Sequence, residues 1–186
     1  MTRGRILLTL RRLRAERKGL ALVEFALIAP VLIALYLGTI EGTSAVRAYM
    51  KVNAATQAYA DLIANQPSVT KSSLAHYCSS VKLVITPLDG TTLSIASASV
   101  TNTNGVIAQD WHDTGQCGSG VGSIAGLTQA AGLTPYSGDS AIVVKANYAY
   151  SSVIHFLLPG TQTLTETAAA RPRQNSTVDC ADCTQN

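Results

Sequence analysis

The chain has 186 residues, of which 47% are hydrophobic, 13% charged and 5% aromatic, and its formal net charge is +3. This length allows one modest domain beside a membrane anchor. The charge is uneven, because residues 1–18 carry seven basic side chains against one acidic side chain. A basic tail can bind nucleic acid, but here it stands directly before a long apolar run, which argues against that class of protein.

The apolar run extends from Leu20 to Ile40 and contains one ionisable residue, Glu24. A bilayer core requires roughly 20 apolar residues as a helix, so the run predicts a transmembrane span. A charged side chain inside hydrocarbon costs on the order of 2.5–3.5 kcal/mol on insertion scales. Glu24 is therefore expected to be protonated or to pair with a cation.

Gly19 lies between the basic segment and the apolar run. Its missing side chain would let a protease approach the backbone closely. Cleavage after Gly19 would give Leu20 a free α-amine, and Glu24 would lie four residues further on, one helical turn away. The new N-terminus and Glu24 could then neutralise each other, within one subunit or between adjacent ones.

A glycine followed by an apolar helix with Glu as its fifth residue resembles the signal sequence of type IV pilins. The longer string from Arg17 to Val31 resembles the TadE family of Tad/Flp pilus pseudopilins. Arg171-Pro172-Arg173 is similar to the Arg-Pro-Arg ending of TadE-like chains, while residues 66–160 match only in general character. Tad pseudopilins often carry Tyr after the Glu, whereas this chain has Phe25. This difference leaves type IV processing intact but does not define which subfamily applies.

The resemblance implies that residues 1–19 form a leader that a prepilin peptidase removes. Basic residues that flank a span stay in the cytoplasm, and here they include Arg11, Arg12, Arg14, Arg17 and Lys18. We therefore expect a single-pass protein of the bacterial inner membrane with its C-terminal domain exported to the periplasm, or carried into the pilus. A conventional signal peptide is disfavoured, since its apolar core has about 7–15 residues.

The helix is expected to continue beyond the membrane as an amphipathic extension over residues 41–65. One stripe recurs at spacings of three and four residues: Ala45, Val46, Tyr49, Val52, Thr56, Tyr59, Ala60 and Ile63. Pro67 predicts the end of the helix. Gly38 and Gly42 form a Gly-x-x-x-Gly pair, which fits either close helix contact or the ordinary glycine content of membrane helices.

Residues 66–173 predict an exported α+β domain. Thr70 is a plausible N-cap for a short helix over 70–86. Strands are expected at 91–101, 106–112, 140–150 and 161–170, giving a small antiparallel sheet, with a hairpin turn at Asn104-Gly105. The glycine-rich stretch 113–138 predicts a long loop with one helical turn near 127–131, and residues 157–160 predict a turn between the last two strands. Residues 174–186 predict a loose Cys-containing tail unless its cysteines tie it down.

All four cysteines follow the span, which favours disulfides in an exported domain. Cys78 and Cys117 would join the second helix to the glycine-rich loop, and Cys180 and Cys183 favour a disulfide within the tail or from the tail to the domain. The connectivity stays open. No metal site is expected, because His76, His112 and His155 lie far apart without ligand spacing.

A catalytic site is not expected either. Asp110, His112 and Asp113 surround Trp111, but no nucleophile motif or phosphate-binding loop accompanies them. A solvated loop is the simpler interpretation of this cluster, with Trp111 in the core. We therefore expect no enzyme activity and no cofactor.

The resemblance implies a minor pilin or pseudopilin in Tad/Flp pilus assembly, which serves adherence, biofilm formation or secretion. Its partners would be other Tad pilins and pseudopilins, the prepilin peptidase, the Tad secretion platform with its ATPase, and the lipid bilayer, with no nucleic acid. The alternative is an unprocessed single-pass envelope protein whose exported domain binds a partner. Retention of residues 1–18 in the mature chain would distinguish the alternative.

Overall fold

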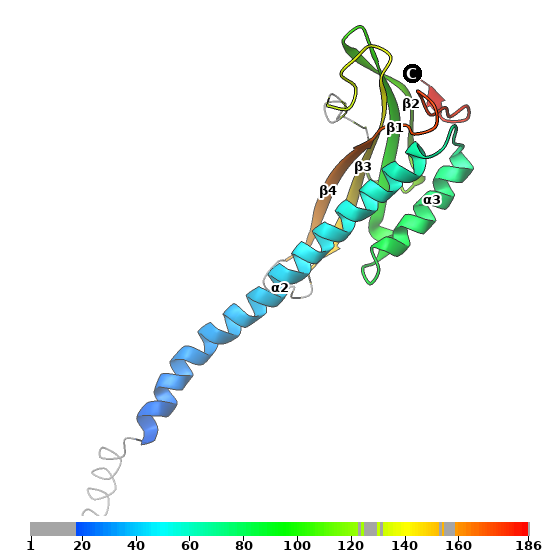
Figure 1. Ribbon diagram of the computed structural model, residues 1–186. Helices are drawn as coiled ribbons and strands as arrows, with labels where there is room; N and C mark the ends of the chain where they lie inside the picture. The colour runs from blue at the N-terminus through cyan, green and yellow to red at the C-terminus, as the bar shows by residue number, and fades with distance from the viewer. Residues whose placement is uncertain are drawn as a thin grey trace, which may run out of the picture. The chain divides into compact units, whose positions relative to one another are not determined.

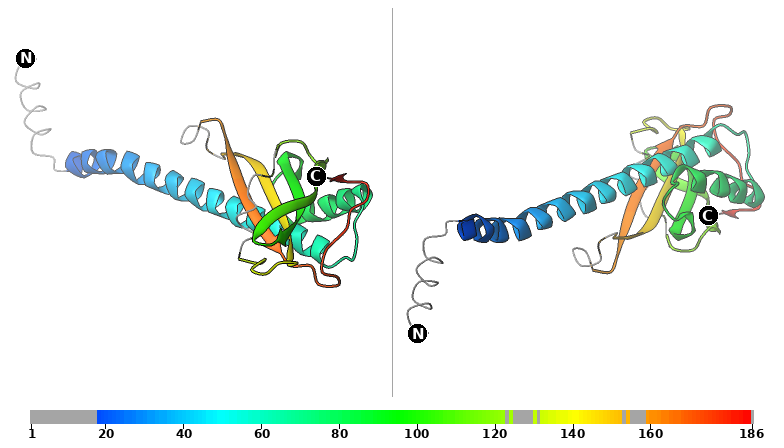
Figure 2. Two further views of the ribbon diagram at one scale, coloured as in Figure 1. Left: turned by 90° about the horizontal axis from the view of Figure 1, so that it is seen from above. Right: turned by 90° about the horizontal axis from the view of Figure 1, so that it is seen from below.

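The computed structural model describes residues 18–122, 124, 130, 132–152, 154 and 159–185. The chain divides into two compact units, Met1–Thr43 and Ser44–Asn186. Within the second unit, two helices pack against a five-stranded antiparallel sheet (Figures 1 and 2). The expected α+β class is confirmed.

Helix α2 (Lys18–Ala64) is continuous over 47 residues and includes Pro30. The sequence predicted a helix over 20–65, so its C-terminal end is placed within one residue. A proline removes one backbone hydrogen bond, and membrane helices tolerate this loss. At the C-terminal end of α2, the backbone N–H groups of Asn65 and Gln66 donate to the carbonyls of Asp61 and Ile63 in a final turn before Pro67.

In the second unit, the buried face of α2 differs in part from the predicted stripe. Val52, Thr56, Tyr59, Ala60 and Ile63 are buried as expected. The prediction is wrong for Val46 and Tyr49, since their side chains are 57% and 50% exposed. Their places on the packed face are taken by Ala48 and Ala55, both fully buried. These small residues let the helix backbone approach the sheet, and the pattern of large side chains alone could not show this.

The short second helix is confirmed as α3 (Lys71–Val84). Thr70 is its N-cap, and the hydroxyl of Thr70 accepts a hydrogen bond from the backbone of Ser73 while the Ser73 hydroxyl accepts one from Thr70. This reciprocal capping box satisfies two donors at the start of the helix. Leu74, Cys78 and Val81 are buried beneath the helix. A 3-10 turn, η1 (Gly90–Thr92), then leads into the sheet.

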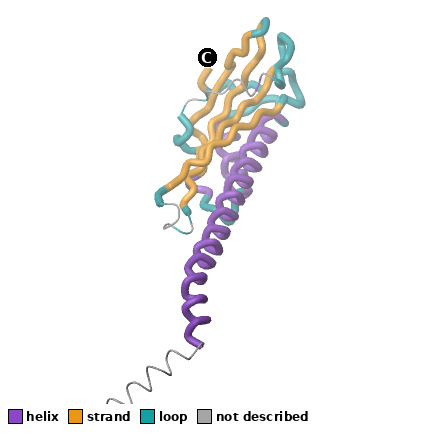
Figure 3. The backbone as a smooth tube through the Cα atoms, turned by 90° about the vertical axis from the view of Figure 1, so that its left-hand side faces the viewer, coloured by secondary structure: helices purple, strands orange, loops and turns teal. Residues whose placement is uncertain are grey.

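The sheet contains β1 (Leu93–Thr103), β2 (Val106–Cys117), β3 (Ser140–Ser151), β4 (Thr161–Ala170) and β5 (Thr184–Gln185). Their spatial order is β4-β3-β1-β2-β5, with every neighbouring pair antiparallel. Figure 3 shows the strands in orange beside the helices in purple. The expected turn joins β1 to β2, where Asn104 and Gly105 both have positive φ, 53° and 88°. That conformation matches the right-handed twist of a hairpin.

Two strand predictions require correction. Strand β2 continues to Cys117 instead of ending at His112, so the predicted loop over 113–138 is shorter than expected. Asp113 lies on this strand and is 5% exposed, whereas the sequence predicted a solvated loop at this position. The sheet also has a fifth strand, formed by the C-terminal tail. The predicted helical turn near 127–131 and much of the predicted turn at 157–160 lie outside the described residues.

Each face of the sheet has its own apolar cluster. One cluster lies between the sheet and the two helices and includes Tyr59, Leu74, Ile95 and Trp111. The other lies on the opposite face, where Ala98, Val100 and Val143 contact residues of the connection between β2 and β3. The sheet is thus covered on both faces within this unit.

The C-terminal tail is not a loose segment, because hydrogen bonds tie it to the rest of the domain. The backbone N–H of Val69 donates to the carbonyl of Asp179 at 2.8 Å, and Trp111 Nε1 donates to the carbonyl of Val178 at 2.7 Å. The carboxylate of Asp182 accepts the backbone N–H of Lys71 at the first residue of α3. The tail therefore follows the turn between α2 and α3 and ends as β5 beside β2.

Candidate functional site: the apolar helix

In the first unit, the segment Gly19 to Ile40 of α2 exposes its apolar side chains. All its residues are exposed except Ala29 and Leu37, which are half-buried. Leu22 and Leu27 are each 72% exposed, and Phe25 is 65% exposed. Contiguous apolar surface of this kind marks a membrane or protein interaction site. In the described part of the chain, one helix is long and apolar enough to cross a membrane.

The predicted processing and assembly residues lie in the first turns of this helix. Gly19, Leu20, Glu24 and Phe25 are all helical and exposed. A Cβ atom at Gly19 would meet no described atom within 4 Å. Lys18 begins the helix, while Arg11, Arg12, Arg14 and Arg17 lie outside the described residues. The helix therefore carries Leu20 and Glu24 at the four-residue spacing that brings neighbours onto one face.

Two threonine hydroxyls, within and just after the apolar run, have local partners. The hydroxyls of Thr39 and Thr43 each donate to the backbone carbonyl four residues earlier, at 2.8 Å. Such bonds satisfy a hydroxyl without any partner from another helix. Around Gly38 and Gly42, an added Cβ would meet no described atom within 4 Å. Both interpretations of the glycine pair stay open.

The structure joins the four cysteines into two disulfides. Cys78 of α3 bonds Cys117 at the end of β2, 39 residues along the chain. Cys180 bonds Cys183, which closes a short loop in the tail. These two sulfur atoms and the carboxylate of Asp182 lie close enough together to consider a metal. Because both sulfurs are consumed in a disulfide, they are not available as thiolate ligands.

The residues around Trp111 have structural contacts. Trp111 is 2% exposed, in the core as predicted. Asp110 accepts hydrogen bonds from the hydroxyls of Ser99 and Thr101, and Asp113 accepts the backbone N–H of Gln116. His112 contacts Gln109 at 2.8 Å. The bonds to Asp110 join β2 to β1, whereas the other two contacts lie within β2.

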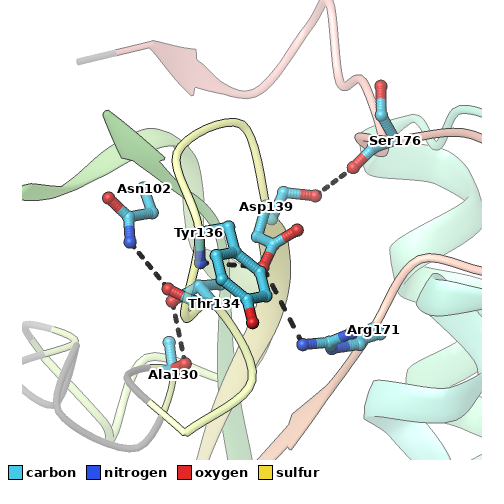
Figure 4. Close-up of polar contacts among 8 residues, drawn as sticks. Asn102, Ala130, Thr134, Tyr136, Asp139, Arg171 and Ser176 are labelled. Atoms are coloured by element: carbon cyan, nitrogen blue, oxygen red, sulfur yellow. Dashed lines mark hydrogen bonds and ion pairs between the residues drawn. The ribbon is translucent and has the colours of Figure 1, made fainter. Parts of the chain in front are cut away.

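The Arg-Pro-Arg motif has a structural role that the sequence analysis did not find. Arg171 lies 3.9 Å from the carboxylate of Asp139, which also accepts the backbone N–H of Tyr136 (Figure 4). The hydroxyl of Ser140, the residue after Asp139, donates to the carbonyl of Ser176. Arg173 pairs instead with Asp61 of α2 at 2.9 Å. The two arginines thus connect the end of β4 to the β2–β3 connection and to the helix.

Residues 19–61 match the family model described as TadE-like protein. The match confirms the predicted resemblance and covers α2 alone, without any part of the sheet. Searches of curated proteins and of solved structures gave no match. The match suggests a protein associated with the Tad pilus and its components, and the apolar helix is consistent with single-pass anchoring in a membrane.

Proposed function

We propose that this chain is a TadE-like pseudopilin that acts in the assembly of a Tad/Flp pilus, as a minor subunit or as an assembly factor. The observation that carries the proposal is the coincidence of three features on residues 19–61: the family match, an exposed apolar helix, and Gly19 followed by Glu24. The sheet domain, Ser44–Asn186, would be the exported part.

The first step is removal of the basic leader by a prepilin peptidase, which cuts the peptide bond between Gly19 and Leu20. No described atom lies within 4 Å of a Cβ at Gly19, which supports this step, because the cleaved bond must enter a protease site as backbone. The basic side chains Arg11, Arg12, Arg14, Arg17 and Lys18 keep this end of the chain on the cytoplasmic side. The orientation then places the sheet domain in the periplasm.

The second step is transfer of the mature helix from lipid to other helices. Its exposed apolar side chains exchange contact with acyl chains for contact with neighbouring subunits, so little apolar surface meets water. Glu24 favours the transfer from lipid to a neighbouring subunit. A carboxylate is costly in hydrocarbon and becomes stable when it pairs with the α-amine of Leu20 on an adjacent subunit.

The partners that follow from this proposal are other Tad pilins and pseudopilins, the prepilin peptidase and the secretion platform with its ATPase. Phe25 stands where many Tad pseudopilins carry Tyr, and it is 65% exposed on the apolar surface. Its ring would contribute apolar contact at the same level as Glu24. We expect the assembled structure to serve adherence, biofilm formation or secretion, with no enzymatic activity in this chain.

The experiment that tests the proposal is N-terminal mass spectrometry of the chain from the membrane fraction, in cells with and without the prepilin peptidase. A mature start at Leu20 that requires the peptidase is the expected result. An intact Met1 terminus in both strains would overturn the proposal and favour the unprocessed anchored protein. A start near Ala45 would indicate conventional signal-peptide cleavage and would remove Glu24 from the mature chain.

A further inference from the structure

A groove of about 740 Å³ opens on the surface of the unit Ser44–Asn186, and all the described residues that line it belong to that unit. Its walls come from three segments: residues 44–51 of α2, residues 87–92 before β1, and residues 148–151 at the end of β3. Tyr148 and Tyr150 are each 4% exposed, so the groove rests on the core of the domain. Its volume lies within the range of about 300–1,000 Å³ that ligand sites have.

The end of β3 has a strand partner on one side only. β3 lies between β4 and β1 in the sheet (Figure 1). Strand β4 pairs with it as far as Ser151, whereas the pairing with β1 stops at Tyr148, opposite Leu93. Before Leu93 the chain forms the turn η1 instead of a strand. Beside residues 149–151, the position that β1 would occupy therefore holds no paired strand among the described residues, and the groove opens there.

An open sheet position of this kind suits an extended peptide. A partner segment can add to a sheet as a further strand, in which main-chain hydrogen bonds supply affinity and pockets for alternate side chains supply specificity. The groove offers an apolar lining for such side chains, formed by Met50, Pro87, Leu88 and the rings of Tyr148 and Tyr150. We therefore expect the bound segment to carry a large apolar side chain.

The α2 wall carries two cations. Arg47 and Lys51 are four residues apart and both line the groove. Nζ of Lys51 donates to the carbonyl of Val84 at 3.2 Å. Arg47 is exposed, and its guanidinium has no hydrogen bond or ion pair with the residues that the structure describes. A guanidinium can hold a carboxylate through two parallel hydrogen bonds, so Arg47 is suited to an acidic side chain of the partner.

A carboxylate lines the groove from another wall. Asp89 precedes η1, and its Oδ1 accepts hydrogen bonds from the backbone N–H and the hydroxyl of Thr91 at 2.9 Å and 2.7 Å. These bonds fix the carboxylate at the start of η1, where it disfavours a second acidic group nearby. The groove therefore favours an acidic side chain beside Arg47 and disfavours one beside Asp89, which sets the direction of a bound segment.

We propose that this groove binds an extended segment of a partner protein, which adds as a short strand beside residues 149–151 and carries one acidic residue next to a large apolar residue. The acidic side chain binds Arg47, and Lys51 adds positive charge on the same wall. The apolar side chain lies against the lining around Leu88 and Tyr148. This inference goes beyond the proposed function and does not depend on it, since every residue that it uses belongs to the unit Ser44–Asn186.

The test begins with a phage-displayed library of random octapeptides, selected on the full chain in detergent micelles. We expect the enriched peptides to carry one Asp or Glu next to a large apolar residue. An enriched peptide is then synthesised, and its Kd is measured by fluorescence anisotropy. Arg47→Gln should raise this Kd about tenfold, the effect of losing one charge-assisted hydrogen bond. Asp89→Asn should instead allow peptides with a second acidic residue to bind, since the repelling carboxylate is lost.

Methylation of backbone nitrogens in the synthetic peptide tests strand addition directly. Successive N–H groups of a strand point to opposite edges, and one edge of the added strand faces β3. Methylation of one alternating set of nitrogens should therefore abolish binding, and methylation of the other set should leave it intact.

Arg171→Gln is the matched control for Arg47→Gln. Arg171 follows Ala170, which pairs with Ile142 at the opposite end of β3 from the groove, so this variant should bind the peptide like the parent chain. Circular dichroism of each variant checks that the fold is intact. Selection without enrichment of acidic peptides, or an unchanged Kd in Arg47→Gln, would overturn the proposal. Binding that survives both methylated peptides would overturn the added strand.

Discussion

Arg173 binds the end of α2 through two groups at once. Its Nη2 donates to Oδ1 of Asp61 at 2.9 Å, and its backbone N–H donates to the carbonyl of Ala64 at 2.8 Å. The second bond satisfies one of the last carbonyls of the helix, which have no partner within the helix itself. Arg173, which follows β4 and Pro172, therefore caps the C-terminal end of a helix more than one hundred residues earlier in the chain.

A double-mutant cycle of Arg173→Ala and Asp61→Ala should give a small coupling energy, about 0.2–1 kcal/mol. Both side chains are more than half exposed, 58% and 52%, so solvent screens the charges. The backbone bond to Ala64 survives in every variant. Denaturant unfolding of the full chain in detergent measures the cycle. Arg171→Ala is the control, because its 3.9 Å contact with Asp139 is longer. A coupling well above 1 kcal/mol would show that the pair is not screened.

The two disulfides should differ in their contribution to stability. In the chain-entropy account, stabilisation grows with the closed loop, and the separations are 39 residues for Cys78–Cys117 and 3 for Cys180–Cys183. Replacing the first pair by Ala should cost about 4 kcal/mol and the second about 2 kcal/mol. Thermal unfolding of the two double variants gives the comparison. Equal losses would mean that the tail disulfide acts mainly through its contacts in the folded state.

The burial of Tyr59 predicts a loss of stability at high pH. Burial is the main cause that raises the pKa of this phenol, with the nearby carboxylate of Asp113 adding to the effect. The folded-state pKa thus lies above the unfolded value of about 10. The contribution to stability is complete below pH 10 and falls as the pH rises beyond it, because the unfolded state releases its proton first.

Tyr59→Phe should remove this part of the pH dependence, at the cost of the hydrogen bond to the carbonyl of Leu74, about 0.5–1.5 kcal/mol. The free energy of unfolding, measured between pH 8 and pH 11 in buffers of equal ionic strength, gives both effects. Tyr136→Phe serves as the control, because that side chain is 75% exposed. An unchanged slope in Tyr59→Phe would contradict the assignment of the alkaline transition to Tyr59.

The elements that the sequence could predict are those specified by local chemistry. Thr70 before an apolar period predicted α3, and Asn104-Gly105 predicted the hairpin between β1 and β2, because capping and positive φ are local requirements. The prediction of a membrane span from the apolar run around Glu24 likewise required only residues that are neighbours in the sequence. These parts of the fold and of the candidate site depend on no distant contact.

The parts that could not be predicted depend on pairing between distant segments. The tail lacks an apolar period, yet two hydrogen bonds hold it to the domain. The indole N–H of Trp111 donates to the carbonyl of Val178, and the carboxylate of Asp182 accepts the backbone N–H of Lys71 at the start of α3. These bonds involve backbone groups, which leave no residue pattern. The groove lined by Arg47 and Asp89 could not be predicted either, since its lining comes from three separate segments of the chain.

Replacing Glu24 by Ala should leave leader removal intact and reduce association with neighbouring pilus subunits. Glu24 is exposed on the apolar helix, so the substitution removes a carboxylate without opening a cavity in the sheet domain. A lost hydrogen bond between charged groups is worth about 1.5–3 kcal/mol, which corresponds to roughly a tenfold to hundredfold weaker pairing. Cysteine cross-linking in isolated membranes, together with the mass of the mature N-terminus, measures association and processing in the same sample.

Leu22→Ala is the matched control for Glu24→Ala, because Leu22 is 72% exposed one turn from the same end of the helix and carries no charge. It should keep processing and should reduce association less than Glu24→Ala does, because it removes apolar contact without removing a charge. Glu24→Gln keeps the shape of the side chain and should behave like Glu24→Ala, since a neutral amide cannot neutralise an α-amine. Normal cross-linking in Glu24→Gln would show that size rather than charge matters at this position. An uncut Glu24→Ala chain would instead assign Glu24 to recognition by the peptidase.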